Sequence, residues 1–176
     1  MTTLVIGGAA SGKSRYAESL VLASSAPLRI YVATMQPFDG ECRLRIERHR
    51  RMRAHKQFIT EERYTDLAGL RVPPGSAVLL ECLSNLTANE LYSPGGAGNG
   101  ALEAVACGVQ SLARQCRDLV VVTNEVFCGG KDYQGDTLRY LRVLALANRS
   151  IAGWADNVCE VLCGLPHYLK GKEPCD

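Results

Sequence analysis

The eight residues from position 7 to position 14 have the types and the spacing of a phosphate-binding loop. They satisfy the pattern G-x-x-x-x-G-K-[ST]. In such a loop the glycines let backbone amides curl around a phosphate, and the following helix adds partial positive charge at its amino end. The lysine reaches the β- and γ-phosphates, and the last hydroxyl is a ligand for Mg²⁺. The sequence therefore predicts a site for a nucleoside triphosphate and its magnesium ion, formed by Gly7, Gly8, Ala9, Ala10, Ser11, Gly12, Lys13 and Ser14.

Two acidic side chains follow apolar runs that have the composition of buried strands. Glu81 closes the run AVLLE, and Glu125 follows VVVTN. P-loop enzymes commonly place a carboxylate near the magnesium shell, on a strand next to the loop. We expect Glu81 to join Ser14 in this role or to contact the nucleotide, with Glu125 as the alternative and a solvent-facing acid as the simpler interpretation.

A strongly basic segment extends from Arg43 to Lys56. It holds seven basic residues and one acid, a local net charge of +6 that leaves the rest of the chain at −4. Its arginines could clamp a triphosphate, follow a nucleic-acid backbone or solvate a surface helix. Composition alone does not decide among these three interpretations.

His49 lies inside this basic segment and is our candidate nucleophile. Neighbouring guanidinium groups disfavour the charged form of an imidazole, and the neutral ring is nucleophilic. On a helix, Arg45, His49 and Arg53 would share one face, so the ring and two phosphate-binding side chains could point to one site. A surface or core histidine is the alternative; His55 and His167 lack such surroundings, and we expect them to be structural.

The elements that must position these residues alternate along the chain. Apolar strand patterns occur near residues 4–6, 30–34, 58–60, 76–82, 118–123 and 158–162, and helical patterns follow Ser14 and span 41–55, 101–116 and 137–155. Residues 93–100 have the composition of a flexible loop. Strands that are apolar throughout require a sheet covered on both faces. The sequence therefore predicts an α/β fold with a mainly parallel sheet flanked by helices, forming a single P-loop domain over residues 1–176.

The composition is that of a globular protein. Of the 176 residues 47% are hydrophobic and 22% charged, which excludes disordered, collagen-like and coiled-coil chains. No apolar stretch reaches the ~18 to 20 residues that cross a bilayer, and no basic leader precedes a cleavable apolar run. We expect a cytoplasmic protein without membrane insertion. The eight cysteines form no C-x-x-C pair and are expected to be reduced.

Taken together, these motifs resemble the family of bifunctional adenosylcobinamide kinase / adenosylcobinamide-phosphate guanylyltransferases, which assemble the nucleotide loop of cobalamin. The similarity runs along nearly the whole chain. The stretches that carry it are LVIGGAASGKSRYAE, YVATM, RIERHRRMR, LLECLSNLTAN, VVVTNEV and LANRSIAGWADNVCEVLCGLPHYLKG.

This resemblance implies two reactions and a set of site residues. In the first, ATP or GTP phosphorylates adenosylcobinamide; in the second, GTP gives GMP to an enzyme histidine, which passes it to adenosylcobinamide phosphate. It also implies a RecA-like sheet assembled as a homotrimer. The implied catalytic residues are His49 and Lys13. The implied nucleotide contacts, besides the P-loop, are Ala33, Thr34, Met35, Arg50, Arg51, Met52, Arg53, Glu62 and Glu81.

Two other functions remain as alternatives from the residues themselves. One is an ordinary P-loop kinase whose arginines close over the substrate without a covalent intermediate. The other is a RecA-like ATPase that binds nucleic acid along residues 43–56. The chain has few aromatic residues and none of them interleaves the arginines, so base-stacking platforms are missing there. We therefore expect no nucleic-acid partner.

Overall fold

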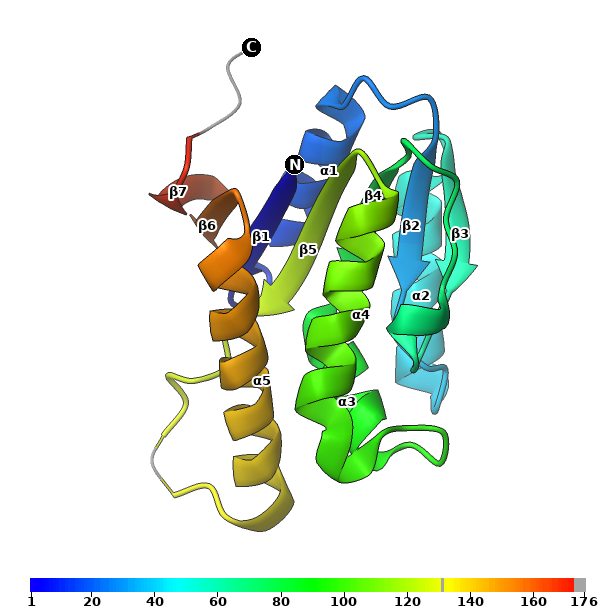
Figure 1. Cartoon of the computed structure of the whole chain (residues 1–176). Coiled ribbons are helices and arrows are strands. Elements are labelled where there is room, and N and C mark those ends of the chain that lie inside the picture. The colour runs from blue at the N-terminus through cyan, green and yellow to red at the C-terminus, as the bar shows by residue number, and fades with distance from the viewer. Residues whose placement is uncertain (131, 173–176) are drawn as a thin grey trace.

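The computed structural model describes residues 1–130 and 132–172, with the side chains of Arg45 and Met52 left out. In this part of the chain seven strands form one sheet in the order β3-β2-β4-β5-β1-β6-β7 (Figure 1). The strands are β1 (Thr2–Gly7), β2 (Arg29–Ala33), β3 (Phe58–Glu62), β4 (Ala77–Glu81), β5 (Asp118–Asn124), β6 (Asn157–Leu162) and β7 (Leu165–Lys170). Every strand pair is parallel except β6 with β7. The predicted α/β fold with a mainly parallel sheet is confirmed.

Helices cover both faces of the sheet (Figure 1). They are α1 (Lys13–Ala23), α2 (Gly40–Arg53), α3 (Leu83–Tyr92), α4 (Ala101–Gln115) and α5 (Gly135–Trp154), with short 3₁₀ turns at Leu67–Gly69 and Gly98–Gly100. The helices α3, α4 and α5 lie in front of the sheet in the view of Figure 1, and α1 and α2 lie behind it.

The sheet is buried because successive side chains of each central strand enter two different cores. In β4, Val78 and Leu80 pack in the core formed with α3, α4 and α5, whereas Ala77 and Leu79 pack in the core formed with α1. All four side chains are fully buried. An uninterrupted apolar run is the sequence pattern that such a doubly covered strand requires.

Two elements differ from the sequence-based expectation. The helix α3 was not predicted, because its buried face includes Ser84, Thr87, Asn89 and Glu90 in place of a regular apolar stripe. Their polar atoms bond to backbone groups; the Thr87 hydroxyl, for example, donates to the Leu83 carbonyl at 2.8 Å. The strand expected at 158–162 is not the last one, because β7 turns back antiparallel to it through the tight turn at Cys163 and Gly164.

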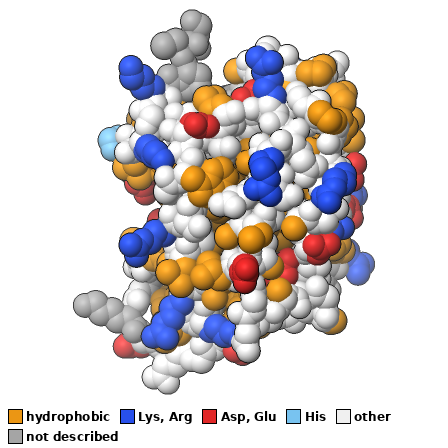
Figure 2. Space-filling view, in the orientation of Figure 1, with side chains coloured by type: hydrophobic (Ala, Val, Ile, Leu, Met, Phe, Trp, Pro, Cys, Tyr) orange, Lys and Arg blue, Asp and Glu red, His pale blue; other side chains and the backbone are white. Residues whose placement is uncertain are grey.

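The surface in front of the sheet carries no concentrated charge. Figure 2 shows Lys and Arg side chains interspersed with Asp, Glu and apolar side chains over α4 and α5. Among the described residues, no helix combines the length and the apolar character needed to cross a membrane. None of the seven described cysteines forms a disulfide bond; Cys175 lies outside the described residues.

Candidate active site

The P-loop lies between β1 and α1, as the sequence predicts. The Lys13 ammonium group donates to the Gly8 carbonyl at 3.0 Å, which folds the side chain back over the loop. Gly12 has a φ of 91°, a left-handed conformation that favours glycine. A Cβ atom at Gly7 would lie 2.5 Å from the Ser11 hydroxyl oxygen, so glycine is needed there for space. The loop thus adopts a conformation that depends on glycine at these two positions.

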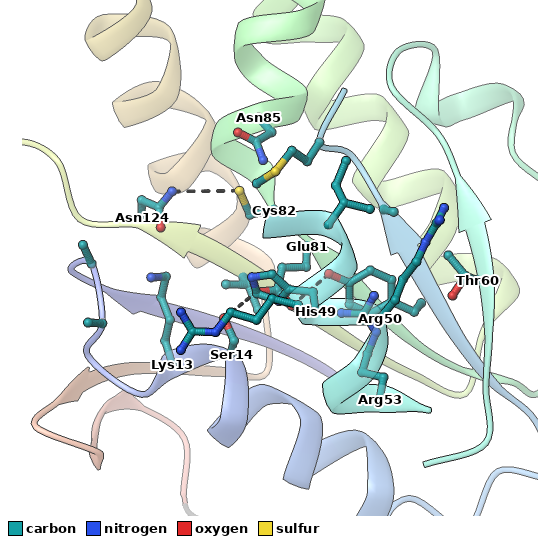
Figure 3. A pocket seen from close by; sticks show the side chains of 18 of the residues that line it. Lys13, Ser14, His49, Arg50, Arg53, Thr60, Glu81, Cys82, Asn85 and Asn124 are labelled. Carbon is teal, nitrogen blue, oxygen red and sulfur yellow. Dashed lines mark hydrogen bonds between the residues drawn. The ribbon is translucent and has the colours of Figure 1, made fainter. Parts of the chain in front are cut away.

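One cavity of about 530 Å³ opens at the carboxyl ends of the parallel strands, above this loop. Figure 3 shows side chains from the P-loop, α2, β3 and β4 converging on it. The sequence-predicted residues that line it are Ala9, Ala10, Lys13, Ser14, Ala33, Met35, His49, Arg50, Arg53, Glu62 and Glu81, together with Glu125. The candidate nucleophile His49 and the P-loop lysine Lys13 therefore line one cavity.

The Glu81 carboxylate is held from two sides. The Ser14 hydroxyl donates to Oε1, and the Tyr31 hydroxyl donates to Oε2 at 3.2 Å. Burial, and next the Glu81 charge, raise the pKa of Tyr31 well above its ordinary value, so this phenol remains a donor. Mg²⁺ prefers oxygen ligands and is usually held by one or two carboxylates with phosphate oxygens and waters. The Ser14 hydroxyl and the Glu81 carboxylate fit a magnesium ion that accompanies a nucleotide.

The helix α2 presents one face to the cavity. Its amino end is capped by Asp39, whose carboxylate accepts from the Cys42 amide at 2.7 Å. Among the described side chains of this helix, the less exposed ones are Cys42, Ile46, His49 and Arg53, which recur at the spacing of one helical face. The predicted shared face thus holds for His49 and Arg53; the side chain of Arg45 lies outside the described residues.

The arginines after His49 have different surroundings. Arg53 is only 6% exposed, and its guanidinium carbon lies 3.3 Å from the centroid of the Tyr31 ring. Its Nη1 atom is buried without a hydrogen-bond partner among the described residues. Arg50 pairs with Glu62 at the cavity rim, and Glu62 also accepts from the Tyr64 hydroxyl at 2.7 Å. Arg53 is the arginine whose unpartnered donors are best placed for a phosphate.

Besides Gly7, Gly8, Ser11 and Gly12 of the P-loop, the predicted nucleotide contacts Arg51 and Thr34 do not line the cavity. Arg51 is 82% exposed and pairs with Glu47 one helical turn away. Thr34 is fully buried, and its hydroxyl donates to the Cys82 carbonyl at 2.8 Å and accepts from the Cys82 amide at 2.7 Å. It thereby links the ends of β2 and β4. The side chain of Met52 lies outside the described residues.

Nine further described lining residues were not predicted from the sequence, and four of them have side chains that could contact a nucleotide. Tyr31 and Arg48 line the cavity, as do the amides of Asn85 and Asn124. Asn124 ends β5 directly before Glu125, so the strand-end argument that found the acid extends to it. Asn85 lies on the helix that was not predicted, and Tyr31 lies within a strand pattern that offered no signal beyond burial.

Comparisons with known proteins show which sequences this chain resembles. Residues 3–169 match the profile of the CobU family, described as cobinamide kinase / cobinamide phosphate guanyltransferase. The bifunctional adenosylcobalamin biosynthesis protein CobU of Escherichia coli (strain K12) is 36% identical over 184 residues, which cover 97% of this chain and 100% of that protein. The bifunctional adenosylcobalamin biosynthesis protein CobP of Pseudomonas aeruginosa is 32% identical over 175 residues, which cover 98% of this chain and 99% of that protein.

A solved structure of lower similarity supports the fold alone. An ATPase from the type III secretion system of pathogenic bacteria superposes with a TM-score of 0.54 at 8% identity. The superposition covers 95% of this chain and 56% of that ATPase. The sheet is therefore of the P-loop, RecA-like type, as expected.

Proposed function

The chain belongs to the cobinamide kinase / cobinamide phosphate guanyltransferase family, and from this membership we propose how one cavity serves both activities. The protein is a bifunctional enzyme of cobalamin biosynthesis that uses nucleotide substrates. Our proposal is that the same P-loop binds the nucleotide in both reactions, that His49 carries GMP in the second, and that the corrinoid substrates are adenosylcobinamide and its phosphate.

In the kinase reaction, the acceptor hydroxyl of cobinamide attacks the γ-phosphorus of ATP or GTP. A new O–P bond forms, the bond between γ-phosphorus and the bridging oxygen breaks, and the nucleoside diphosphate leaves. Lys13 and the P-loop amides hold the phosphates in line and offset the charge that develops on them. Magnesium, when bound at Ser14 and Glu81, would neutralise part of that charge.

The acceptor hydroxyl must also lose its proton, and we propose that the Glu125 carboxylate accepts it as the general base. This side chain lines the cavity, and its backbone amide donates to the Gly7 carbonyl at 2.9 Å, which places it beside the P-loop strand. One of its oxygens accepts from the Phe127 amide at 2.9 Å. Glu81 is a poorer candidate for the base because its carboxylate, held toward Ser14, is the one proposed to bind magnesium.

In the guanylyltransferase reaction, a ring nitrogen of His49 attacks the α-phosphorus of GTP. An N–P bond forms, the α–β phosphoanhydride bond breaks, pyrophosphate leaves, and the ring loses its other N–H proton. A phosphate oxygen of cobinamide phosphate then attacks the same phosphorus and the N–P bond breaks, while the departing ring takes up a proton from solvent in place of the one it lost. A covalent intermediate of this kind splits one transfer between bulky partners into two displacements.

The observation that carries this proposal is that His49 and Lys13 line the same cavity. The buried Arg53 and the rim residue Arg50 supply positive charge where phosphates would lie (Figure 3). An ordinary kinase could use the same arginines to bind phosphates, but it would not need a histidine at this place.

The family resemblance also leads us to propose a homotrimer. Phe38 and Leu44, beside and on α2, are 71% and 68% exposed, which is unusual for large apolar side chains near an active site. Light scattering should then give three times the chain mass of 19.1 kDa. A mass equal to that of one chain would contradict this assembly.

A substitution at Lys13 tests whether one P-loop serves both reactions. Lys13→Ala should reduce both phosphorylation of cobinamide and guanylylation of the enzyme, because each reaction needs the lysine to hold the departing phosphates. Both rates are measured on the same preparation, with Lys170→Ala as the control on the far strand β7. Full guanylylation by Lys13→Ala would imply a separate GTP site.

A further inference from the structure

Tyr31 lies between the helix that carries His49 and the carboxylate that faces Ser14. It belongs to β2 and is only 4% exposed. Its hydroxyl donates to Glu81 Oε2 at 3.2 Å, while Oε1 of the same carboxylate accepts from Ser14. The guanidinium group of Arg53, from the last turn of α2, lies over the Tyr31 ring. One side chain thus contacts both halves of the site.

We propose that Tyr31 is a positioning residue that couples the docking of α2 to the orientation of Glu81 toward Ser14. The hydroxyl orients the carboxylate at the proposed magnesium site. The ring packs against Arg53 and thereby holds α2 against the cavity. This inference rests on the proposed function, because it gives that function's two phosphate-binding regions a common support.

The hydroxyl half of this role follows from the hydrogen-bond geometry. A carboxylate that is fixed through one oxygen can direct its second oxygen at a single partner, which here is Ser14. The Tyr31 phenol is the donor in this hydrogen bond, since the carboxylate oxygen can only accept. Without it, Glu81 is free to rotate away from Ser14, and oxygen ligands that are not pre-oriented bind Mg²⁺ less tightly.

The ring half of the role follows from how Arg53 is held. An acidic partner would hold this arginine but would also neutralise it, whereas an aromatic face attracts the cation and leaves its charge directed at the cavity. The buried Nη1 atom without a hydrogen-bond partner shows that the donor capacity of Arg53 is not used up by the described protein groups. The attraction is strongest where water is excluded, as at this 6% exposed side chain.

The coupling must act in both directions, because linkage between two binding events is reciprocal. A metal–nucleotide complex at Ser14 and Glu81 should therefore strengthen the docking of α2, and undocking of α2 should weaken the metal site. The docking of α2 can be read by limited digestion with trypsin, since the helix carries the exposed arginines Arg43, Arg48, Arg50 and Arg51.

Two substitutions separate the two halves of the role. Tyr31→Phe removes the hydroxyl and keeps the ring, and Tyr31→Leu removes both. Tyr92→Phe is the control, because its hydroxyl donates to the Asp136 carbonyl outside the cavity. The probes are Mn²⁺ with GDP, whose binding is followed by electron paramagnetic resonance, and the rate at which trypsin cleaves within α2. Thermal midpoints of all four proteins show whether each remains folded.

We expect Tyr31→Phe to bind Mn²⁺ about tenfold more weakly in the presence of GDP, the effect of one hydrogen bond to a charged group, and to keep α2 protected by Mn²⁺ and GDP. Tyr31→Leu should lose both Mn²⁺ affinity and protection of α2, and Tyr92→Phe should lose neither. Mn²⁺ affinity of Tyr31→Phe within twofold of the wild type would overturn the hydroxyl half. Protection of α2 that survives in Tyr31→Leu, or is already lost in Tyr31→Phe, would overturn the ring half.

This experiment is independent of the chemistry assigned to His49. Both probes use GDP, which lacks the pyrophosphate leaving group of guanylylation and the γ-phosphate of the kinase reaction, so they report binding and docking whether or not the enzyme is ever guanylylated. The wild type could show the expected coupling and yet take up no GMP. That result would contradict the proposed function and still support the role of Tyr31.

Discussion

The ammonium group of Lys56, just after α2, pairs with the carboxylate of Glu18 on α1, which is 2% exposed. This ion pair attaches the end of the His49 helix to the helix that begins at the P-loop. Removing only Lys56 would leave a buried charge without its partner. We predict that Lys56→Met lowers the free energy of unfolding by about 3 kcal/mol, the low end for a broken buried pair, because Lys56 retains 20% exposure.

Urea denaturation measures this loss. The double variant Lys56→Met with Glu18→Leu should recover most of it, because neither charge is then left unpaired. The exposed pair of Arg51 with Glu47 is the matched control, and Arg51→Met should change stability by no more than about 0.5 kcal/mol. Equal losses of unfolding free energy in Lys56→Met and Arg51→Met would show that the pair of Lys56 with Glu18 stabilises the fold no more than an exposed pair does.

Arg53 and Arg51 stand two positions apart on α2 and should differ in catalysis. Arg53 lines the cavity with an unpartnered donor, whereas Arg51 faces solvent. Arg53→Met should slow guanylylation about 100- to 1,000-fold, the usual effect of losing one donor to a developing negative charge. Arg51→Met should remain within twofold of the wild type. Single-turnover rates of guanylylation with GTP test this expectation. Equal losses of rate in Arg53→Met and Arg51→Met would instead indicate that the arginines of α2 bind phosphate alike.

Glu125 should matter for one reaction and not for the other. If it takes the proton of the acceptor hydroxyl, Glu125→Gln will slow phosphorylation of cobinamide about 100-fold or more and leave transfer of GMP to the enzyme unchanged. The two rates are compared on one preparation. A parallel loss in both would instead place Glu125 among the groups that hold the nucleotide.

The Mg²⁺ concentration that both reactions require should rise when the Ser14 hydroxyl is removed. Ser14→Ala removes a proposed magnesium ligand and a donor to Glu81, so both reactions should need a higher Mg²⁺ concentration for half-maximal rate. Ser19→Ala is the control, since the Ser19 hydroxyl only donates to the Tyr16 carbonyl on the exposed side of α1. Removal of the metal with a chelator should stop both reactions in the wild type. Unchanged Mg²⁺ dependence in Ser14→Ala would contradict the assignment.

Most of the sheet could be predicted because its strands carry a pattern that only a doubly covered parallel sheet requires. The run from Ala77 to Glu81 is one example, and the P-loop motif fixed the order of β1, loop and α1. The helix α3 was missed because burial of Asn89 and Glu90 depends on tertiary partners: the Asn89 amide donates to the Thr34 carbonyl at 2.8 Å. No local sequence pattern predicts such a contact.

Site residues could be predicted where they belong to one sequence motif. They could not be predicted where their role comes from contacts with residues far away in the sequence. Lys13, Ser14 and His49 stand in recognisable motifs, and the structure brings them to one cavity. Tyr31 gains its role only through Glu81 and Arg53, which are 50 and 22 positions away. Thr34 was expected at the nucleotide through the family motif, but its hydroxyl is engaged by the Cys82 backbone.

The most direct test of the account is whether GMP becomes bonded to His49. The wild type is incubated with Mg²⁺ and GTP labelled at the α-phosphate, denatured, and examined for bound label, with His55→Ala as the matched control. The wild type and His55→Ala should carry a label that acid releases and alkali does not, as an N–P bond requires, and His49→Ala should carry none. Equal labelling of His49→Ala and the wild type would contradict the central claim.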